Sequence, residues 1–167
     1  MKPILEVKNL TYIYSAGTPF EHKALDDISF SVERGEFIGI IGHTGSGKST
    51  LMQQLNGLLK PTSGTVHVNG YSLERIRKRE VPYLRRTVGV VFQDYRLIEK
   101  MTVYENVAFA MRVVGARESE IKERVPYVLE LVGLESKMNR HPNEMSGGEQ
   151  QRLAIARALV NNPSTII

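Results

Sequence analysis

Short stretches in the first seventy residues alternate apolar and polar side chains, which is the pattern of a strand with one buried face. The clearest is 28–32, where Ile, Phe and Val alternate with serines. Weaker alternation at 4–8 and 65–69 predicts two more short strands. Two continuous apolar runs, at 37–41 and 88–92, predict strands that are buried on both faces.

Helical spacing of apolar residues becomes dominant in the second half of the chain. A first helix is predicted at 49–55, and the region from about residue 103 onward is mainly helical. One helix there has apolar residues at helical spacing, namely Ile121, Val125, Val128, Leu129 and Val132. Another covers 149–160, and 164–167 begins a further strand. This order predicts an α/β fold with strands around the first helix and a helical insertion at about 94–145.

The composition is that of one soluble globular domain. The chain has 167 residues, of which 41% are hydrophobic and 24% charged, so disorder and fibrous folds are not expected. The sequence has no cysteine, which excludes disulfide scaffolds, thiolate metal sites and cysteine nucleophiles from it. No apolar run approaches the roughly 20 residues that span a bilayer, and residues 1–7 lack a signal-peptide core. We therefore expect a cytoplasmic domain.

The net charge of +4 does not by itself indicate nucleic-acid binding. Much of the excess lies in one stretch that contains Arg75, Arg77, Lys78, Arg79, Arg85 and Arg86. Two interpretations stay open for this stretch. It is either a solvated face or a surface that lies beside anionic lipid or an acidic partner.

Residues 42–49 satisfy the phosphate-binding pattern G-x-x-x-x-G-K-[ST], between a predicted buried strand and a predicted helix. The glycines let successive backbone N–H groups converge on a phosphate at the positive end of the helix. Lys48 is expected to reach the β- and γ-phosphates of a nucleotide, and Ser49 to ligate Mg²⁺. The residues expected to line the nucleotide site are Gly42, His43, Thr44, Gly45, Ser46, Gly47, Lys48, Ser49 and Thr50. His43 occupies a variable position of the pattern and is expected to be a spectator rather than a ligand.

A second glycine motif, Met-Ser-Gly-Gly-Glu-Gln-Gln-Arg, follows at 145–152 and opens a predicted helix. A hydroxyl and two glycines at that point expose N–H donors at a helix N-terminus, which favours an anion. A single domain does not need two binding sites for the same phosphate. The second site is therefore expected to serve a nucleotide held by a partner chain.

Together the two motifs resemble the nucleotide-binding domain of ABC (ATP-binding cassette) proteins, over essentially the whole chain. The resemblance implies ATP and Mg²⁺ as cofactors, with Tyr14 stacked on adenine. It implies that Gln93 contacts Mg²⁺ or the attacking water and senses a transmembrane partner. Lys48 and Gln93 are thus the candidate catalytic residues, and Ser49 and Gln93 the candidate metal ligands. The residues implied to close over ATP of the opposite protomer, in a head-to-tail dimer, are Ser146, Gly147, Gly148 and Glu149.

In this family an apolar strand ending in Asp-Glu comes next, followed by a switch histidine. Residues 164–167 resemble the first part of that strand, and the sequence ends before either carboxylate. The resemblance implies an ATP-binding core at 1–93, a helical subdomain at about 94–145, and the signature helix with the start of the next strand at 146–167. We expect one truncated nucleotide-binding domain, nearly inactive and poorly stable by itself, from a parent that hydrolyses ATP.

The sequence resembles two subfamilies of the ABC family. Residues 1–70, with GEFIGIIGHTGSGKSTLMQQLNGLLKPTSG at 35–64, look like the ATPase subunit of energy-coupling factor (ECF) importers for vitamins or metal ions. Residues 73–163, with REVPYLRRTVGVVFQDYRLIEKMTVYENVAFAMRVVGA at 79–116, look like the cell-division ATP-binding protein FtsE. The apparent junction lies near 70–75, which predicts a hybrid or a divergent member.

Partner choice is expected around residue 93 and the helical insertion, which are of the FtsE type. We therefore favour an integral membrane subunit of the FtsX type, and the alternative is an ECF transmembrane coupling subunit. The chain is then expected to lie peripherally on the cytoplasmic face of the cell membrane. It is expected to pair with a second ATP-binding subunit and with no nucleic acid.

Three alternatives come from other functional classes. A small-molecule kinase also has a phosphate-binding loop, although it leaves the glycine motif at 145–152 unexplained. A non-hydrolytic binding module is consistent with the missing carboxylates. A soluble ABC ATPase that acts on DNA or ribosomes is the third, but such proteins usually carry two cassettes or large insertions.

Overall fold

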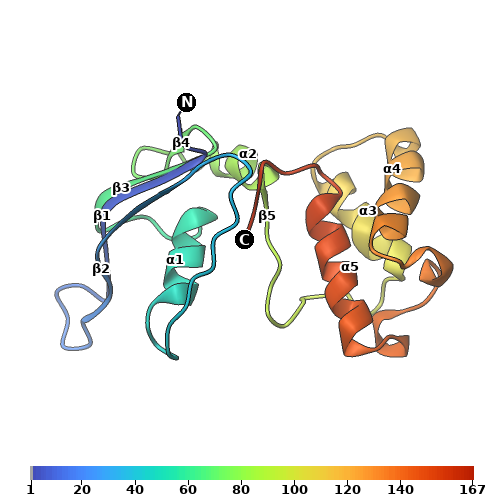
Figure 1. The fold of residues 1–167 in the computed structure, drawn as a ribbon, viewed down its shortest axis with the longest axis horizontal. Helices are drawn as coiled ribbons and strands as arrows, with labels where there is room; N and C mark the ends of the chain where they lie inside the picture. Colours follow the sequence, from blue (N-terminus) through green and yellow to red (C-terminus); the bar gives the residue numbers. More distant parts are fainter. Residues whose placement is uncertain (1) are drawn as a thin grey trace. The chain divides into compact units, whose positions relative to one another are not determined.

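The computed structural model describes residues 2–167, which form two compact units, one ending at Arg85 and the other beginning at Arg86. The first holds an antiparallel sheet and one main helix, and the second is largely helical (Figure 1). The finer division expected from the sequence, at 93 and 145, stays a prediction.

A four-stranded antiparallel sheet organises the first unit, in the spatial order β2-β1-β3-β4. Its strands are β1 (Leu5–Tyr14), β2 (His22–Val32), β3 (Ser63–Val68) and β4 (Tyr71–Ser72). The strands predicted from alternation at 4–8, 28–32 and 65–69 are confirmed, and the first two extend further than predicted. Long cross-strand pairing on both sides of β1 explains the extension.

The helix α1 (Lys48–Leu55) packs against β2 and β3, which confirms the predicted helix at 49–55. Its Leu51 and Leu55 are buried, and burial of a leucine side chain contributes about 1.5–3 kcal/mol. The other buried apolar residues of this unit are Leu5, Val7, Leu10, Leu25, Val66, Val68, Leu73, Ile76 and Leu84. Leu84 comes from α2 (Val81–Arg86), a short helix that the hydrophobic pattern did not reveal. The core therefore fixes the start of α1 relative to the sheet.

The apolar run at 37–41 is not the buried strand that the sequence predicted. Phe37 and Ile41 are 98% and 97% exposed, and Ile38 and Ile40 are more than two-fifths exposed. A strand buried on both faces needs neighbours on both sides and a layer over each face. Within the described part of the chain, no strand pairs with this run. The segment therefore has irregular backbone where the prediction placed a central strand.

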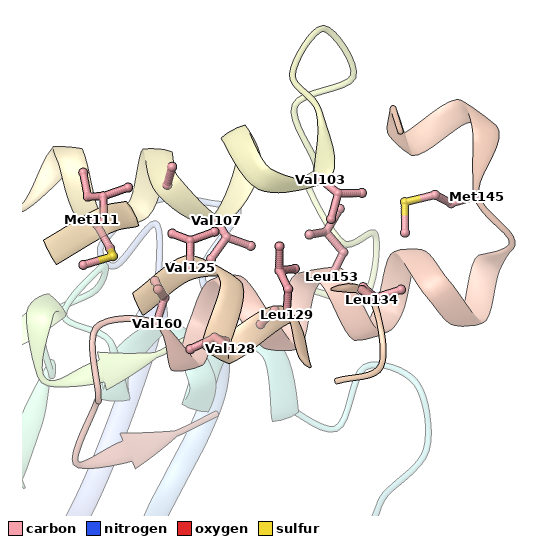
Figure 2. Close-up of a cluster of buried hydrophobic side chains, with 13 residues drawn as sticks. Val103, Val107, Met111, Val125, Val128, Leu129, Leu134, Met145, Leu153 and Val160 are labelled. Carbon is pink, nitrogen blue, oxygen red and sulfur yellow. The ribbon is translucent and has the colours of Figure 1, made fainter. Parts of the chain in front are cut away.

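Three helices form the second unit: α3 (Val103–Val113), α4 (Glu118–Leu131) and α5 (Gly147–Leu159). The predicted helices from about 103 onward and at 149–160 are thereby confirmed. Two short 3₁₀ turns, η1 (Glu135–Lys137) and η2 (Pro142–Glu144), connect α4 to α5. The buried cluster between the helices is shown in Figure 2 and consists of Val103, Val107, Ala108, Met111, Ile121, Val125, Val128, Leu129, Leu134, Met145, Leu153, Ala156 and Val160.

Four of the five residues in the predicted helical stripe of α4 belong to that cluster, and Val132 packs against it. Pro126 lies inside α4 without ending it. None of the helices found in residues 2–167 combines the length and apolar character that crossing a bilayer requires.

A short parallel pair, β5 (Val88–Gly89) and β6 (Thr165–Ile166), completes the second unit. The strand predicted at 164–167 is confirmed. The strand predicted at 88–92 is only partly correct, because the regular ladder covers just its first two residues. One further bond, from the N–H of Val91 to the carbonyl of Ile167 at 2.8 Å, prolongs the pairing.

Candidate functional site

The loop at 42–49 owes its shape to two glycines in the left-handed region of backbone space. Gly45 and Gly47 have φ angles of +84° and +88°, which side-chain-bearing residues rarely adopt. At Gly47 the space is also closed, because an added Cβ would lie 2.4 Å from the carbonyl oxygen of Ala24. The loop therefore turns sharply against β2 immediately before α1 begins.

The ammonium group of Lys48 folds back over this loop. Its Nζ donates hydrogen bonds to the carbonyl oxygens of Gly42, at 2.6 Å, and His43, at 2.8 Å. A third bond goes to the hydroxyl of Ser46 at 3.2 Å. The imidazole Nδ1 of His43 faces the carbonyl of Thr44 at 2.8 Å, within the loop itself. The positive charge of Lys48 is thus held at the mouth of the loop without a carboxylate partner in residues 2–167.

The N-terminus of α1 is built to accept an anion. No side chain of residues 2–167 caps it, and its first turn carries no acidic residue. The first N–H groups of a helix have no acceptor within the helix, and the helix dipole leaves a positive partial charge there. This end of the helix, the two glycine turns and Lys48 together fit the phosphate groups of a nucleotide.

The first turn of α1 also offers a hydroxyl that fits Mg²⁺. Ser49 is exposed, whereas the neighbouring Thr50 is buried. In the part of the chain that the structure describes, no three His, Asp or Glu side chains gather as a metal site. Mg²⁺ prefers oxygen ligands and often keeps water and substrate phosphates as partners. The donor set that fits here is therefore the Ser49 hydroxyl with phosphate oxygens and water.

Tyr14 is brought next to α1. Its hydroxyl shares a hydrogen bond with the Thr50 hydroxyl at 3.3 Å, and its ring packs edge-on against Tyr12, with centroids 4.8 Å apart. The structure therefore places Tyr14 beside the first turn of α1. Its predicted stacking on adenine stays a prediction.

The second motif forms the N-terminus of α5, in the other unit. The Ser146 hydroxyl accepts a hydrogen bond from the N–H of Glu149 at 3.4 Å, and the Glu149 carboxylate accepts one from the N–H of Ser146 at 3.0 Å. This reciprocal pair is a capping box. An added Cβ would meet nothing within 4 Å at Gly147 and only the end of the Arg152 side chain at Gly148. Packing within the chain therefore does not explain these two glycines.

Lys137 neutralises the carboxylate at this helix end. Its Nζ lies 2.5 Å from Oε1 of Glu149, and this hydrogen-bonded ion pair lowers the pKa of the Glu149 carboxyl below its usual value. Lys137 thus offsets the negative charge that Glu149 brings to the first turn of α5. Lys137 was not among the predicted site residues, because it lies in η1 and reaches Glu149 only through the fold.

Gln93 is exposed and follows β5. The turn after it is unusual, since Tyr95 and Arg96 are both in the left-handed region, with φ angles of 57° and 47°. The Arg96 guanidinium stacks over the Phe92 ring at 4.1 Å. Gln93 thus begins a tightly folded segment. The contacts that stabilise this segment were not predicted from the sequence.

Comparison with known sequences identifies proteins that are similar to this chain. The ABC transporter family model matches residues 25–167. The cell-division ATP-binding protein FtsE of Streptococcus pneumoniae serotype 2 is 51% identical over 164 residues, which are 98% of this chain and 70% of that protein. FtsE of Mycobacterium tuberculosis is 54% identical over 144 residues, covering 86% of this chain and 63% of that protein.

The ECF transporter ATP-binding protein EcfA2 of Acetivibrio thermocellus is 49% identical over 166 residues, or 98% of this chain and 58% of that protein. Both predicted resemblances are confirmed. Each runs through nearly the whole chain, so the junction near 70–75 stays a prediction. The chain spans between 58% and 70% of the length of these three relatives.

Two solved structures share the fold. The ATP-binding cassette MJ0796, described as dimeric and bound to ADP and Pi, matches with a TM-score of 0.86 and 36% identity, over 97% of this chain and 72% of that one. CbiO1 of Clostridium perfringens, part of an ABC transporter complex, matches with a TM-score of 0.87 and 36% identity, over 99% and 64%. The predicted P-loop α/β fold is confirmed, and the chain belongs to the ABC transporter family of ATP-binding proteins, with FtsE and EcfA2 among its relatives.

Proposed function

We propose that this chain binds Mg·ATP through the loop at 42–49, and that the protein expressed from its whole gene hydrolyses the nucleotide as the ATPase subunit of an FtsE-like membrane complex. The observation that carries the proposal is the uncapped start of α1, with Lys48 held over a loop of two left-handed glycines. That combination of N–H donors and a flexible cation suits the β- and γ-phosphates.

Different residues of the chain are proposed to bind the phosphates, the metal and the adenine. The backbone of 42–47 and the first turn of α1 bind phosphate oxygens, Lys48 offsets their charge, and the Ser49 hydroxyl holds the metal. Bound Mg²⁺ supplies charge neutralisation of the phosphates. Tyr14 is proposed to carry the adenine, and Gln93 to contact Mg²⁺ or orient the attacking water.

We also propose that Ser146, Gly147, Gly148 and Glu149 close over ATP held by a second ATP-binding subunit. Two observations support this role. The space around both glycines is open, and Lys137 removes the repulsion that Glu149 would exert on a phosphate. MJ0796, which shares the fold, is described as a dimer bound to ADP and Pi.

An integral membrane subunit of the FtsX type is the proposed partner, with the chain peripheral on the cytoplasmic face. FtsE relatives at 45–54% identity support this choice. The second candidate is the ATP-binding subunit of an ECF importer, which the similarity to EcfA2 favours.

The test is to express the protein from its whole gene, with each candidate membrane subunit, and to measure capture and Mg·ATP turnover. We expect the FtsX-type subunit to be captured and to change the rate of phosphate release. Capture of the ECF coupling subunit alone would replace the first candidate by the second. Phosphate transfer to an acceptor molecule, or ATP binding without turnover, would contradict an ATPase.

A further inference from the structure

Arg157 lies where the pattern of α5 calls for an apolar residue. It occupies the same helical stripe as Leu153, Ala156 and Val160, all of which are buried in the helical cluster. The guanidinium is half-buried, and this burial lowers its pKa. No carboxylate forms an ion pair with it in residues 2–167. A buried charge without a counter-ion is costly, so its hydrogen bonds must offset that cost.

The hydrogen bonds of Arg157 go to the backbone that follows Gln93. One terminal nitrogen donates to the carbonyl oxygen of Tyr95 at 2.5 Å, and the other to that of Arg96 at 2.6 Å. These are the two consecutive residues in left-handed conformation. A residue with a side chain pays about 1–2 kcal/mol in that region, and two in succession persist only when the surroundings hold them. The planar fork of the guanidinium, whose donors point to two neighbouring oxygens, provides that hold.

A second side chain secures the other end of the same segment. Asn106 of α3 is fully buried, and its amide nitrogen donates to the carbonyls of Ile98, Met101 and Thr102, each at 3.0 Å. Its amide oxygen accepts from the N–H of Ile98 at 2.8 Å. The backbone from 95 to 102 is thus tied to α5 at one end and to α3 at the other, and Gln93 lies two residues before the first carbonyl that Arg157 anchors.

We propose that Arg157 is a positioning residue, which fixes the turn at 95–96 so that Gln93 is presented in one orientation relative to α5. Ser146 caps the other end of that helix, eleven positions away, or about 16 Å along the axis. A displacement of the segment after Gln93 must therefore either move α5, with its Ser146 motif, or break both hydrogen bonds. This inference rests on the proposed roles of Gln93 and Ser146.

The test compares three variants of the protein expressed from its whole gene. Arg157→Met removes both donors and keeps the apolar stem, and Arg157→Lys keeps the charge but not the fork. The matched control is Arg124→Met, since Arg124 also donates from a helix to a backbone carbonyl, that of Val160 at 3.2 Å, which lies outside 93–96. Amide hydrogen exchange and Mg·ATP turnover are measured for all three.

If Arg157 positions the turn, Arg157→Met speeds exchange at the Tyr95 and Arg96 amides by about tenfold or more, with little change in α3 and α4. The kcat falls by about tenfold while KM for ATP stays within about twofold, and Arg157→Lys restores part of the rate. Arg124→Met changes neither quantity. If Arg157→Met does not fold, the same criteria apply to Arg157→Lys: faster exchange at Tyr95 and Arg96 with a lower kcat supports the inference, and values equal to those of Arg124→Met overturn it.

Two outcomes would overturn the inference: exchange that rises equally throughout the helices, or a kcat for Arg157→Met equal to that of Arg124→Met. Failure of the proposed function has a different signature. In that case the unmodified protein shows no Mg·ATP turnover in any assembly, while the exchange result still reports whether Arg157 holds the turn.

Discussion

Among single residues, Gly47 has the most restricted position in the phosphate-binding loop. We predict that Gly47→Ala destabilises the protein by more than about 2 kcal/mol, because strain at a left-handed φ and a clash with the Ala24 carbonyl add together. Gly70→Ala is the matched control, since Gly70 has φ +85° and open space around it. Its expected loss is about 1 kcal/mol. Urea denaturation measures both, and equal losses would contradict the clash.

The sequence made some of these side chains predictable and others not. Lys48 and Ser49 could be assigned because the whole motif is contiguous and lies next to its own helix. Arg157 could not, since its acceptors lie 61 and 62 positions earlier in the chain. The sequence does show an arginine in an otherwise apolar helical stripe. That pattern marks Arg157 as unusual, but it does not show which residues Arg157 contacts.

At the level of elements, the start of α5 depends on the ion pair between Lys137 and Glu149. The folded pKa of Glu149 is below its unfolded value near 4.5, so the pair stabilises the protein above that pH. The stabilisation is lost as the pH falls through the lowered, folded pKa. We predict that Lys137→Met lowers the melting temperature at pH 7, and that the difference from the unmodified protein shrinks as the pH falls below 4.5 and through the lowered, folded pKa of Glu149.

Thermal melts at a series of pH values measure this effect. Lys100→Met, at an exposed lysine, is the control and is expected to show no such pH dependence. A Lys137→Met deficit that stays constant from pH 7 into acid would contradict this prediction, because the charge of Glu149 would then have no part in the effect.

The start of α3 depends on Asn106. We predict that Asn106→Ala costs about 2–4 kcal/mol, because several backbone groups between Ile98 and Thr102 lose their buried partner. Asn161→Ala, which removes one hydrogen bond to the Ala110 carbonyl, is expected to cost about 1 kcal/mol. Denaturant midpoints compare the two, and a similar loss for both would refute the idea that Asn106 organises the loop.

Helices were predicted from the sequence more completely than strands, for a physical reason. The stripe of α4 records contacts that one helix makes along its own length, so a local pattern suffices. The run at 37–41 has the composition of a central strand, but a strand also needs partners elsewhere in the chain. This run is exposed in residues 2–167. Composition therefore indicates that a segment favours strand structure, but it does not show which other strand the segment pairs with.

For the whole molecule, the central claim is that the loop at 42–49 and the motif at 146–149 bind the same ATP from two different chains. A variant defective in one motif can then be complemented by a variant defective in the other. In a head-to-tail pair of Lys48→Ala with Ser146→Arg, one of the two composite sites joins an intact loop to an intact Ser146 motif.

Sedimentation with Mg²⁺ and a non-hydrolysable ATP analogue measures whether one ATP joins the two chains. We predict that the unmodified protein forms dimers, that Lys48→Ala and Ser146→Arg alone stay monomeric, and that their equimolar mixture forms heterodimers with one nucleotide bound. Dimers formed by either variant alone as readily as by the unmodified protein, or a mixture that stays monomeric while the unmodified protein dimerises, would contradict the central claim.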